Sequence, residues 1–286
     1  MKVPGCQGAR VPGAKARKRF GQHFLEPAWV EKLIAAIDPR PDEDFIEVGP
    51  GRGAVTRPLA ARARRVVACE LDRDLAADLA ASAPSNLTVV PGDFLDVSAA
   101  RVRTLLPGAM RVVGNLPYNV ASPILFHLVS WFAAGVAVTD ATVMVQREVA
   151  DRLVAPPGTR DYGVLTIMIG QSAEVARLLT LPPGAFRPPP KVHSAVVRLR
   201  FRGTELQPVA AEAFAEVVQG IFTRRRKTLA NALLTVDALD RAAAAAILTH
   251  AAIDGARRPE TLDRAELVRL ADSLVAWRLQ KGVRPY

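Results

Sequence analysis

The sequence lacks most features of secreted, membrane-bound or metal-binding proteins. It contains two cysteines, Cys6 and Cys69, and they lie so far apart that a disulfide is not expected and a reducing cytoplasm fits. No group of cysteines and histidines has metal-ligand spacing. No apolar run approaches the roughly 20 residues that cross a bilayer, and no apolar segment of a secretory signal follows the first basic residues. We therefore expect a cytoplasmic protein with no membrane contact and no metal.

What the sequence does have is an excess of positive charge. Its 286 residues include 38 Lys and Arg against 28 Asp and Glu, a formal net charge of +10. Attraction to a polyanion such as nucleic acid accounts for this excess directly. An Arg-rich, GC-biased proteome accounts for it as well, and the high Ala, Arg and Pro usage favours that alternative. Charge alone leaves both explanations open.

The hydrophobic pattern divides the chain into three parts. Residues 1–14 are rich in Gly and Pro and predict a flexible tail. In residues 15–203 short apolar runs alternate with helical stretches, which predicts an α/β domain with a mostly parallel, doubly wound sheet. The expected strands are 45–48, 65–70, 87–93, 111–115 and 141–145, followed by 174–181 and 192–201 as an antiparallel edge. Residues 204–286 have only helical patterns and predict a small all-helical domain.

The first expected strand runs into Glu47-Val-Gly-Pro-Gly-Arg-Gly53, which predicts a tight turn before a helix. Such turns bind nucleotide-like ligands, because glycine lets the ligand approach the backbone. The G-x-G-x-G spacing differs from that of dinucleotide binders, and the acid before the turn disfavours a pyrophosphate. It suits a ligand with a cationic amino-acid end, such as S-adenosylmethionine. A glycine-rich turn without any ligand is the alternative.

Polar residues end the next three expected strands. Glu70 lies where an acid accepts hydrogen bonds from ribose hydroxyls. Asp93 is positioned to bind an adenine amino group, with Phe94 covering the ring. An acid such as Asp72 or Asp93 is often simply a helix cap. Polar residues at successive strand ends, however, favour a nucleoside site.

The motif Asn115-Leu116-Pro117-Tyr118 ends the fourth expected strand. Pro117 fixes the turn and leaves backbone carbonyls pointing outward. The Asn115 oxygen and such a carbonyl can accept both protons of an exocyclic amine, while the Tyr118 ring stacks on its base. The alternative is an ordinary helix-start turn with Tyr118 in the core.

Several motifs together resemble the small-subunit ribosomal RNA adenine N6,N6-dimethyltransferases. They occupy residues 18–25, 47–51, 114–119, 146–152, 161–163 and 186–194. The resemblance implies a Rossmann-like class I methyltransferase that uses S-adenosylmethionine. It would place two methyl groups on each of two adjacent adenines, in a hairpin near the 3′ end of small-subunit rRNA. It would act as a monomer on a pre-30S particle.

The resemblance also implies roles for individual residues. The cofactor positions would be His23, Leu25, Gly49, Gly51, Glu70, Asp93 and Asn115. The target amine would be held by Asn115, Leu116, Pro117 and Tyr118, and Phe186 would form the second face of a sandwich around the flipped base. The family often has Asn where this chain has His23, which leaves only that contact open.

Basic residues are the candidates for RNA contact. They are Arg17, Lys18, Arg19, Lys191, Arg224, Arg225, Arg226 and Lys227, the last four expected within a helix of the C-terminal domain. Arg198, Arg200 and Arg202 share one face of an expected strand. They would either face phosphates or guard a sheet edge.

Three alternatives to this function differ in class. A related family methylates an adenine of large-subunit rRNA and confers antibiotic resistance; Leu116 and the Pro-rich Phe186 loop favour the small-subunit enzyme. A non-catalytic relative would only bind nucleic acid, which the presence of Glu47, Glu70 and Asp93 disfavours. A nicotinamide dehydrogenase has a different glycine spacing.

Overall fold

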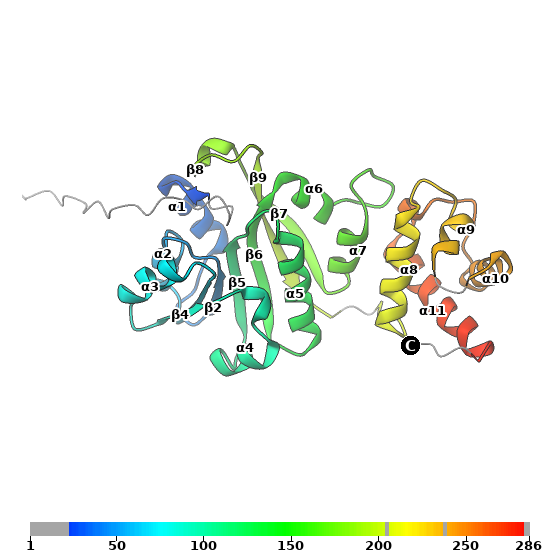
Figure 1. Ribbon diagram of the computed structural model, residues 1–286, viewed down its shortest axis with the longest axis horizontal. Coiled ribbons are helices and arrows are strands. Elements are labelled where there is room, and N and C mark those ends of the chain that lie inside the picture. Colours follow the sequence, from blue (N-terminus) through cyan, green and yellow to red (C-terminus); the bar gives the residue numbers. More distant parts are fainter. Residues whose placement is uncertain (1–22, 204–205, 237–238, 283–286) are drawn as a thin grey trace, which may run out of the picture.

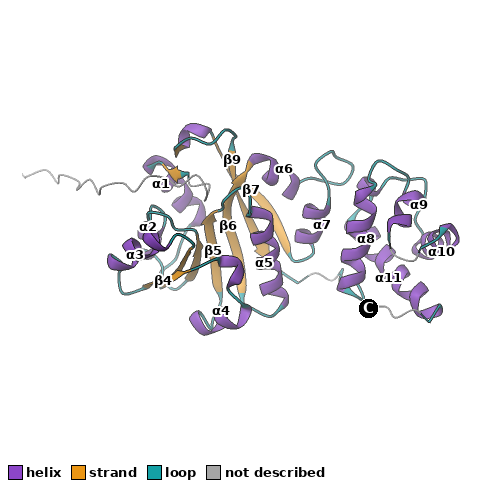
Figure 2. Cartoon of the chain, in the orientation of Figure 1, coloured by secondary structure: helices purple, strands orange, loops and turns teal. Residues whose placement is uncertain are grey.

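A seven-stranded sheet forms the larger part of the molecule, with strand order β4-β3-β2-β5-β6-β9-β7 (Figure 2). The computed structural model describes residues 23–203, 206–236 and 239–282. The strands are β2 (Asp44–Val48), β3 (Arg65–Glu70), β4 (Leu87–Pro91), β5 (Met110–Asn115), β6 (Val138–Gln146), β7 (Ala173–Leu181) and β9 (Ser194–Phe201). The five strands from β4 to β6 in this order are parallel, and β9 runs antiparallel to both of its neighbours. The α/β fold with a parallel sheet and an antiparallel edge is confirmed.

Both faces of the sheet are covered by helices, which explains why its strands are almost continuously apolar. Phe45 packs into a cluster with helices α1 (Pro27–Ile37), α2 (Thr56–Ala60) and α3 (Arg73–Ala81). Its neighbour Ile46 points to the opposite face and packs with α4 (Ala99–Leu105), α5 (Ala121–Ala133) and α7 (Val164–Gly170). Successive side chains of a strand alternate between faces, so the two apolar layers arise from adjacent residues.

The structure adds elements that the hydrophobic pattern did not predict. Helices α4 and α6 (Arg147–Leu153) are short and rich in charged residues, so their periodicity is weak. Strands β1 (Phe24–Leu25) and β8 (Phe186–Arg187) pair antiparallel beside the main sheet. Two residues are too few to show alternation, and these strands lie far apart in the sequence.

Beyond the sheet, helices form the other end of an elongated molecule (Figure 1). They are α8 (Ala211–Thr223), α9 (Leu229–Ala232), α10 (Arg241–Ala251) and α11 (Arg264–Gln280). The start of α11 is fixed by a capping box, in which Asp263 accepts from the Glu266 amide while the Glu266 side chain accepts from the Asp263 amide. None of the helices within the described ranges is long and apolar enough to cross a membrane.

The helical end and the sheet end share apolar packing. Tyr162 and Ile167, which precede β7 in the chain, belong to the buried cluster of the C-terminal helices. The Tyr162 hydroxyl donates to the Leu262 carbonyl at 2.9 Å, and the Gly158 amide donates to the Glu260 carbonyl at 2.7 Å. The last strand ends at Phe201 and the next helix begins at Ala211, yet the second core reaches back across this connection.

A cavity at the carboxyl ends of the strands

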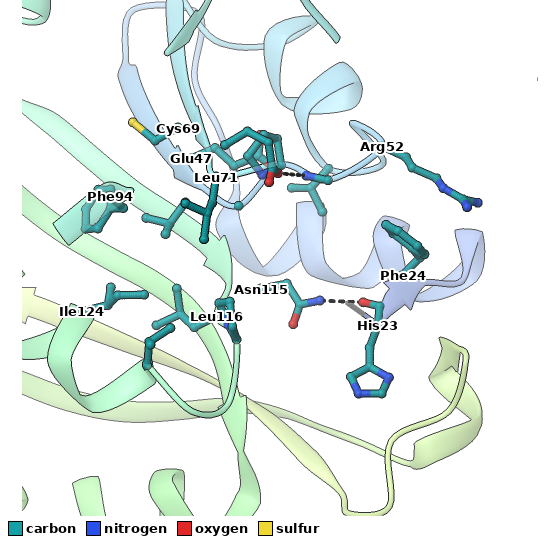
Figure 3. Close-up of a pocket in the computed structure, with 18 of the residues that line it drawn as sticks. His23, Phe24, Glu47, Arg52, Cys69, Leu71, Phe94, Asn115, Leu116 and Ile124 are labelled. Carbon is teal, nitrogen blue, oxygen red and sulfur yellow. Dashed lines mark hydrogen bonds between the residues drawn. The ribbon is translucent and has the colours of Figure 1, made fainter. Parts of the chain in front are cut away.

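A cavity of about 190 Å³ opens where β2, β3 and β5 end (Figure 3). Ligands of open α/β sheets bind at this edge, where the chain leaves the strands in loops. Most of the site residues expected from the sequence line it: His23, Leu25, Gly49, Gly51, Glu70, Asp93, Asn115, Leu116, Pro117 and Tyr118. The fold therefore brings together segments that are separated by almost a hundred residues.

The glycine turn presents bare backbone to this cavity. Gly49 has a φ of +66°, in the left-handed region, and a Cβ built on it would meet nothing within 4 Å. The Gly49 amide donates to the Cys69 carbonyl at 2.9 Å, which ties the turn to β3. A side chain at residue 49 would both strain the backbone and project into the open space. The turn thus leaves room for a ligand directly above β2.

Glu70 closes the same turn from the end of β3. Its Oε2 accepts from the Gly51 amide at 2.8 Å, and its Oε1 accepts from the Asp72 amide at 2.9 Å. Burial raises the pKa of Glu70 above its ordinary value, although these two hydrogen bonds favour the ionised form. Each carboxylate oxygen has a second lone pair, so the predicted ribose contact is compatible with this geometry.

Glu47 has the most perturbed carboxylate of the site. It is 3% exposed, and no described residue donates a hydrogen bond to its Oε2. Burial, with the nearby Glu70 carboxylate as a smaller cause, raises the pKa of Glu47 from 4.5 to about 7. A buried acceptor without a partner is costly, and it is relieved by a ligand that brings a positive charge or a donor.

Asp93 fulfils the cap role and also lines the cavity. Its side chain accepts from the Leu95 amide at 2.9 Å, at the start of a 3₁₀ turn (Phe94–Asp96). Phe94 reaches the cavity but is 4% exposed and packs against Trp131 with ring centroids 4.9 Å apart. The sequence analysis missed Leu71, which lines the cavity and is 49% exposed. An apolar residue directly after the acid of β3 was the available signal.

Asn115 is held in one orientation by the N-terminal segment. Its Nδ2 donates to the His23 carbonyl at 2.9 Å, as Figure 3 shows. No described residue donates to its Oδ1, which is left as an acceptor. In the following turn the Pro117 carbonyl accepts from the Val120 amide at 3.1 Å, whereas no described residue donates to the Leu116 carbonyl. The turn therefore carries two available acceptors, Asn115 Oδ1 and the Leu116 carbonyl oxygen.

Tyr118 lies beside these acceptors with its ring partly buried. Its hydroxyl lies 2.7 Å from the Ser194 hydroxyl, and burial raises its pKa. The His23 ring stacks on it with centroids 5.8 Å apart, and His23 Nδ1 donates to the Pro188 carbonyl at 2.7 Å. This spacing is that of rings in direct contact, so no base fits between these two rings.

Phe186 is placed differently from the expectation. It is 2% exposed, belongs to the apolar cluster beneath β1, and is absent from the cavity lining. Its backbone pairs with Leu25 in the small β1–β8 sheet, which turns the side chain into the core. The expectation that Phe186 faces Tyr118 across a base is thus not met in this structure. The residues from Pro188 to Pro190 suggest a rigid loop on which a Phe often simply packs, but they gave no sign of the pairing with β1.

The basic residues at 224–227 do not lie in a helix, contrary to the sequence analysis. Helix α8 ends at Thr223 and a turn follows. Arg225 forms a salt bridge with Glu260 at 3.3 Å and donates to the Arg160 carbonyl at 2.8 Å, so it joins the two parts of the molecule. The exposed candidates are Arg224, Arg226, Lys227 and Lys191, whereas Arg17, Lys18 and Arg19 lie outside the described residues.

Two expectations for the arginines of β9 are corrected as well. Strand β9 lies between β6 and β7, so its arginines do not guard a sheet edge. Arg198 donates from Nε to the Thr142 hydroxyl at 3.1 Å and from Nη2 to the Ala36 carbonyl. It therefore joins α1 to the sheet and does not face solvent phosphates, while Arg200 and Arg202 are exposed.

The chain matches the family model described as ribosomal RNA adenine dimethylase over residues 13–274. The chain belongs to this family. Among curated relatives, "Ribosomal RNA small subunit methyltransferase A" of Acinetobacter baylyi is 42% identical over 270 residues, covering 92% of this chain and 94% of the relative. The protein of the same name from Chromobacterium violaceum is 44% identical over 261 residues, covering 90% and 95%. The family therefore spans both the sheet and the C-terminal helices.

Solved structures agree on the fold. A dimethyladenosine transferase of Plasmodium falciparum has a TM-score of 0.73 at 23% identity, with 91% of this chain and 99% of that chain covered. The 23S rRNA methyltransferase ErmE has a TM-score of 0.61 at 30% identity, with 88% and 99% covered. ErmE, at 30% identity, is less similar to this chain in sequence than the two curated relatives named for the small subunit, which are 42% and 44% identical.

Proposed function

We propose that this chain transfers methyl groups to N6 of two adjacent adenines, in a hairpin near the 3′ end of small-subunit rRNA. The observation that carries the proposal is the Asn115 amide, which the His23 carbonyl holds at 2.9 Å with Oδ1 left as an acceptor. The Tyr118 ring beside it supplies a face for a base. The curated relatives named for the small subunit support this choice of rRNA.

We propose S-adenosylmethionine as the methyl donor, because the cavity suits its charge and shape. The orphaned Glu47 Oε2 matches a cationic group, and the Gly49 turn leaves open space where a Cβ would project. Glu70 and Asp93 would hold the adenosine part, with Leu71 beside it. When bound, the donor supplies an electrophilic methyl on a sulfonium.

The chain's own contribution to the reaction is to prepare and position the amine. The N6 lone pair of adenine is delocalised into the ring and is a poor nucleophile. Asn115 Oδ1 and the Leu116 carbonyl accept the two N–H bonds, which favours a pyramidal nitrogen with its lone pair turned toward the donor. Such orientation is worth about 7–11 kcal/mol in well-aligned systems. No side-chain base is needed before attack, since the methylated amine is acidic enough to lose its proton to water.

The substrate we propose is small-subunit rRNA within a pre-30S particle, bound by a monomer in the cytoplasm. We assign methyl transfer to residues 15–203 and RNA contact to the helical part, residues 204–286. The exposed Arg224, Arg226, Lys227 and Lys191 favour contact with phosphates. The net charge of +10 supports a polyanionic partner.

Labelled methyl transfer tests the reaction and its target. The purified chain is given methyl-labelled S-adenosylmethionine with undermethylated small subunits, intact large subunits or free rRNA. We expect dimethyladenine in small-subunit rRNA only. Label in large-subunit rRNA would favour the ErmE-like activity, and RNA binding without label would favour a non-catalytic role.

The variant Asn115→Ala tests the activation of the amine. It removes the Oδ1 acceptor and the bond to His23, and we expect methyl transfer to be lost while RNA binding stays nearly unchanged. Filter binding of labelled rRNA measures the second quantity. Normal methylation by this variant would exclude the proposed role of Asn115.

A further inference from the structure

The phenol of Tyr118 is bound to a part of the molecule that is remote in sequence. Its hydroxyl lies 2.7 Å from Oγ of Ser194, 76 residues further along the chain. Tyr118 belongs to the loop that follows β5, whereas Ser194 is the first residue of β9. This hydrogen bond therefore joins the loop after β5 to the sheet.

Ser194 is a rigid anchor for that bond. It is 0% exposed and pairs with Gln146 of β6 on one side and with Leu181 of β7 on the other. A residue paired on both sides in a sheet has little freedom to move, and a serine side chain adds only one short torsion. The position of its hydroxyl is thus determined by the backbone of three strands.

The bond restrains movement of the Tyr118 ring, which would displace a base stacked on it. The Tyr118 hydroxyl lies on the axis of rotation about the Cβ–Cγ bond, so its hydrogen bond fixes where the ring lies (χ1), while the stacked His23 ring restrains the ring plane (χ2). Burial raises the pKa of Tyr118 above its ordinary value, so the phenol stays neutral and keeps this bond throughout the neutral pH range. The position of the ring is thereby set relative to Asn115, which lies three residues earlier in the same turn.

We propose that Ser194 is a positioning residue, which holds the Tyr118 ring in the place from which it presents the target base to Asn115. This inference rests on the proposed function, because it assigns the ring of Tyr118 to the methyl acceptor. It also gives the Pro-rich segment a part in the site that Phe186 does not have. That segment supplies the Pro188 carbonyl to His23 and continues into Ser194, so it is hydrogen-bonded to both of the stacked rings, His23 and Tyr118.

Two variants remove the same hydrogen bond from opposite ends. Ser194→Ala deletes the anchor, and Tyr118→Phe keeps the ring but deletes the hydroxyl. We expect each to lower kcat roughly ten- to a hundredfold, because a small misplacement of a reacting group is enough for such a loss. The KM for S-adenosylmethionine should stay within about twofold, since the bond lies on the side of the acceptor. Ser194→Thr, which keeps a hydroxyl, should restore most of kcat.

The double variant separates positioning from a merely structural role. If Ser194 acts through Tyr118, the double variant should be no slower than either single variant, because both remove one interaction. Losses that multiply, or a wild-type kcat in Ser194→Ala together with a lowered melting temperature, would overturn the proposal. Ser130→Ala is the matched control, since that serine is exposed and donates only within its own helix, to the His127 carbonyl.

Wild type and Asn115→Ala, assayed beside these variants, distinguish the two proposals. Dimethylation by the wild type and none by Asn115→Ala, with normal kcat in Ser194→Ala and Tyr118→Phe, would reject the role of Ser194 alone. Absence of methyl transfer by the wild type would reject the proposed function and this inference with it.

Discussion

The two ends of the parallel sheet treat acidic residues in opposite ways. At the end where the strands begin, buried acids are paired with arginines. At the end where they finish, the acids that line the cavity have no ion pair with any described residue. The same strands carry both kinds of acid, so we attribute the difference in pairing to the different roles of the two ends.

The pairing at the first end is extensive. Arg111, 8% exposed, donates to Asp140 at 2.7 Å, to Glu43 at 2.8 Å and to the Ile37 carbonyl at 2.7 Å. Asp44 receives both Arg64 and Arg65 at the start of β2. A buried charge is tolerated when charge-assisted hydrogen bonds replace its water, and here they also join α1 to the sheet.

At the cavity end the hydrogen bonds to Glu70 and Asp93 come from backbone N–H groups. Glu70 takes two of them, Asp93 one, and Glu47 Oε2 none from the described residues. Burial raises the pKa of both Glu47 and Glu70, and no cation of a described residue beside them offsets it. We infer that the acids at the first end gain their partners when the chain folds. The acids at the cavity end gain a cationic partner only when a ligand binds.

The largest effect is expected from breaking the paired end. In Arg111→Met, Asp140 and Glu43 lose the buried guanidinium between them, so the free energy of unfolding should fall by about 3–5 kcal/mol. Denaturant unfolding at pH 7 measures it. The control Arg152→Met breaks only an exposed pair with Glu148 and should change stability by less than about 1 kcal/mol. Equal losses in the two variants would contradict the assigned difference between buried and exposed pairs.

Glu47→Gln sharpens the comparison at the cavity end. The folded-state pKa of Glu47, about 7, exceeds its ordinary 4.5, so between these values the folded protein binds a proton that the unfolded chain does not. Its contribution to stability therefore falls as the pH rises from 4.5 to 7, by roughly 3 kcal/mol. The variant should lack this loss and be more stable than wild type at pH 8, yet bind S-adenosylmethionine more weakly.

Unfolding at pH 5 and pH 8, with calorimetric titration of the donor, measures both quantities. Glu148→Gln, at an exposed helix position, should keep the wild-type pH profile. A Glu47→Gln protein with that same profile would show that the buried carboxylate is already satisfied in the folded chain.

A smaller effect is expected from Asp44→Asn. Burial alone would raise the pKa of Asp44, but hydrogen bonds from Arg64 and Arg65 outweigh it and lower the pKa below 3.8. The stability from this carboxylate is present above pH 3.8 and is lost as the pH falls through the lowered value. Because both arginines are about half exposed, we expect a loss of about 1–2 kcal/mol at pH 7.

Chemical unfolding at pH 7 and in the acid range checks this prediction, with the exposed Asp78→Asn as control. The difference between Asp44→Asn and wild type should shrink in acid. A difference that persists below the lowered pKa would mean that the carboxylate acts through its shape rather than its charge.

Local sequence was sufficient for the main sheet because its strands are buried on both faces. The expected strand 65–70 coincides with β3 (Arg65–Glu70), whose apolar run ends at Glu70. The positions of Gly49, Glu70 and Asn115 at strand ends follow from the same pattern, since parallel strands finish at one edge. Most of the cavity was therefore predictable without any knowledge of long-range contacts.

The errors concern contacts between distant segments. The family resemblance implied that Phe186 lies at the base, and nothing local indicated the pairing of β8 with β1. The bond between Asn115 and the His23 carbonyl spans 92 residues, and the Tyr118–Ser194 bond leaves no pattern in either segment. The end of α8 at Thr223 was also missed, because the basic run that follows contains no helix breaker.

The packing of Tyr162 and Ile167 among the C-terminal helices has a consequence for how the molecule comes apart. These two side chains are 4% and 3% exposed, although they precede the last two long strands in the chain. Separating the helical part would expose them to water and break the Tyr162–Leu262 bond. We therefore expect the two parts to melt as one cooperative unit rather than as independent domains on a tether.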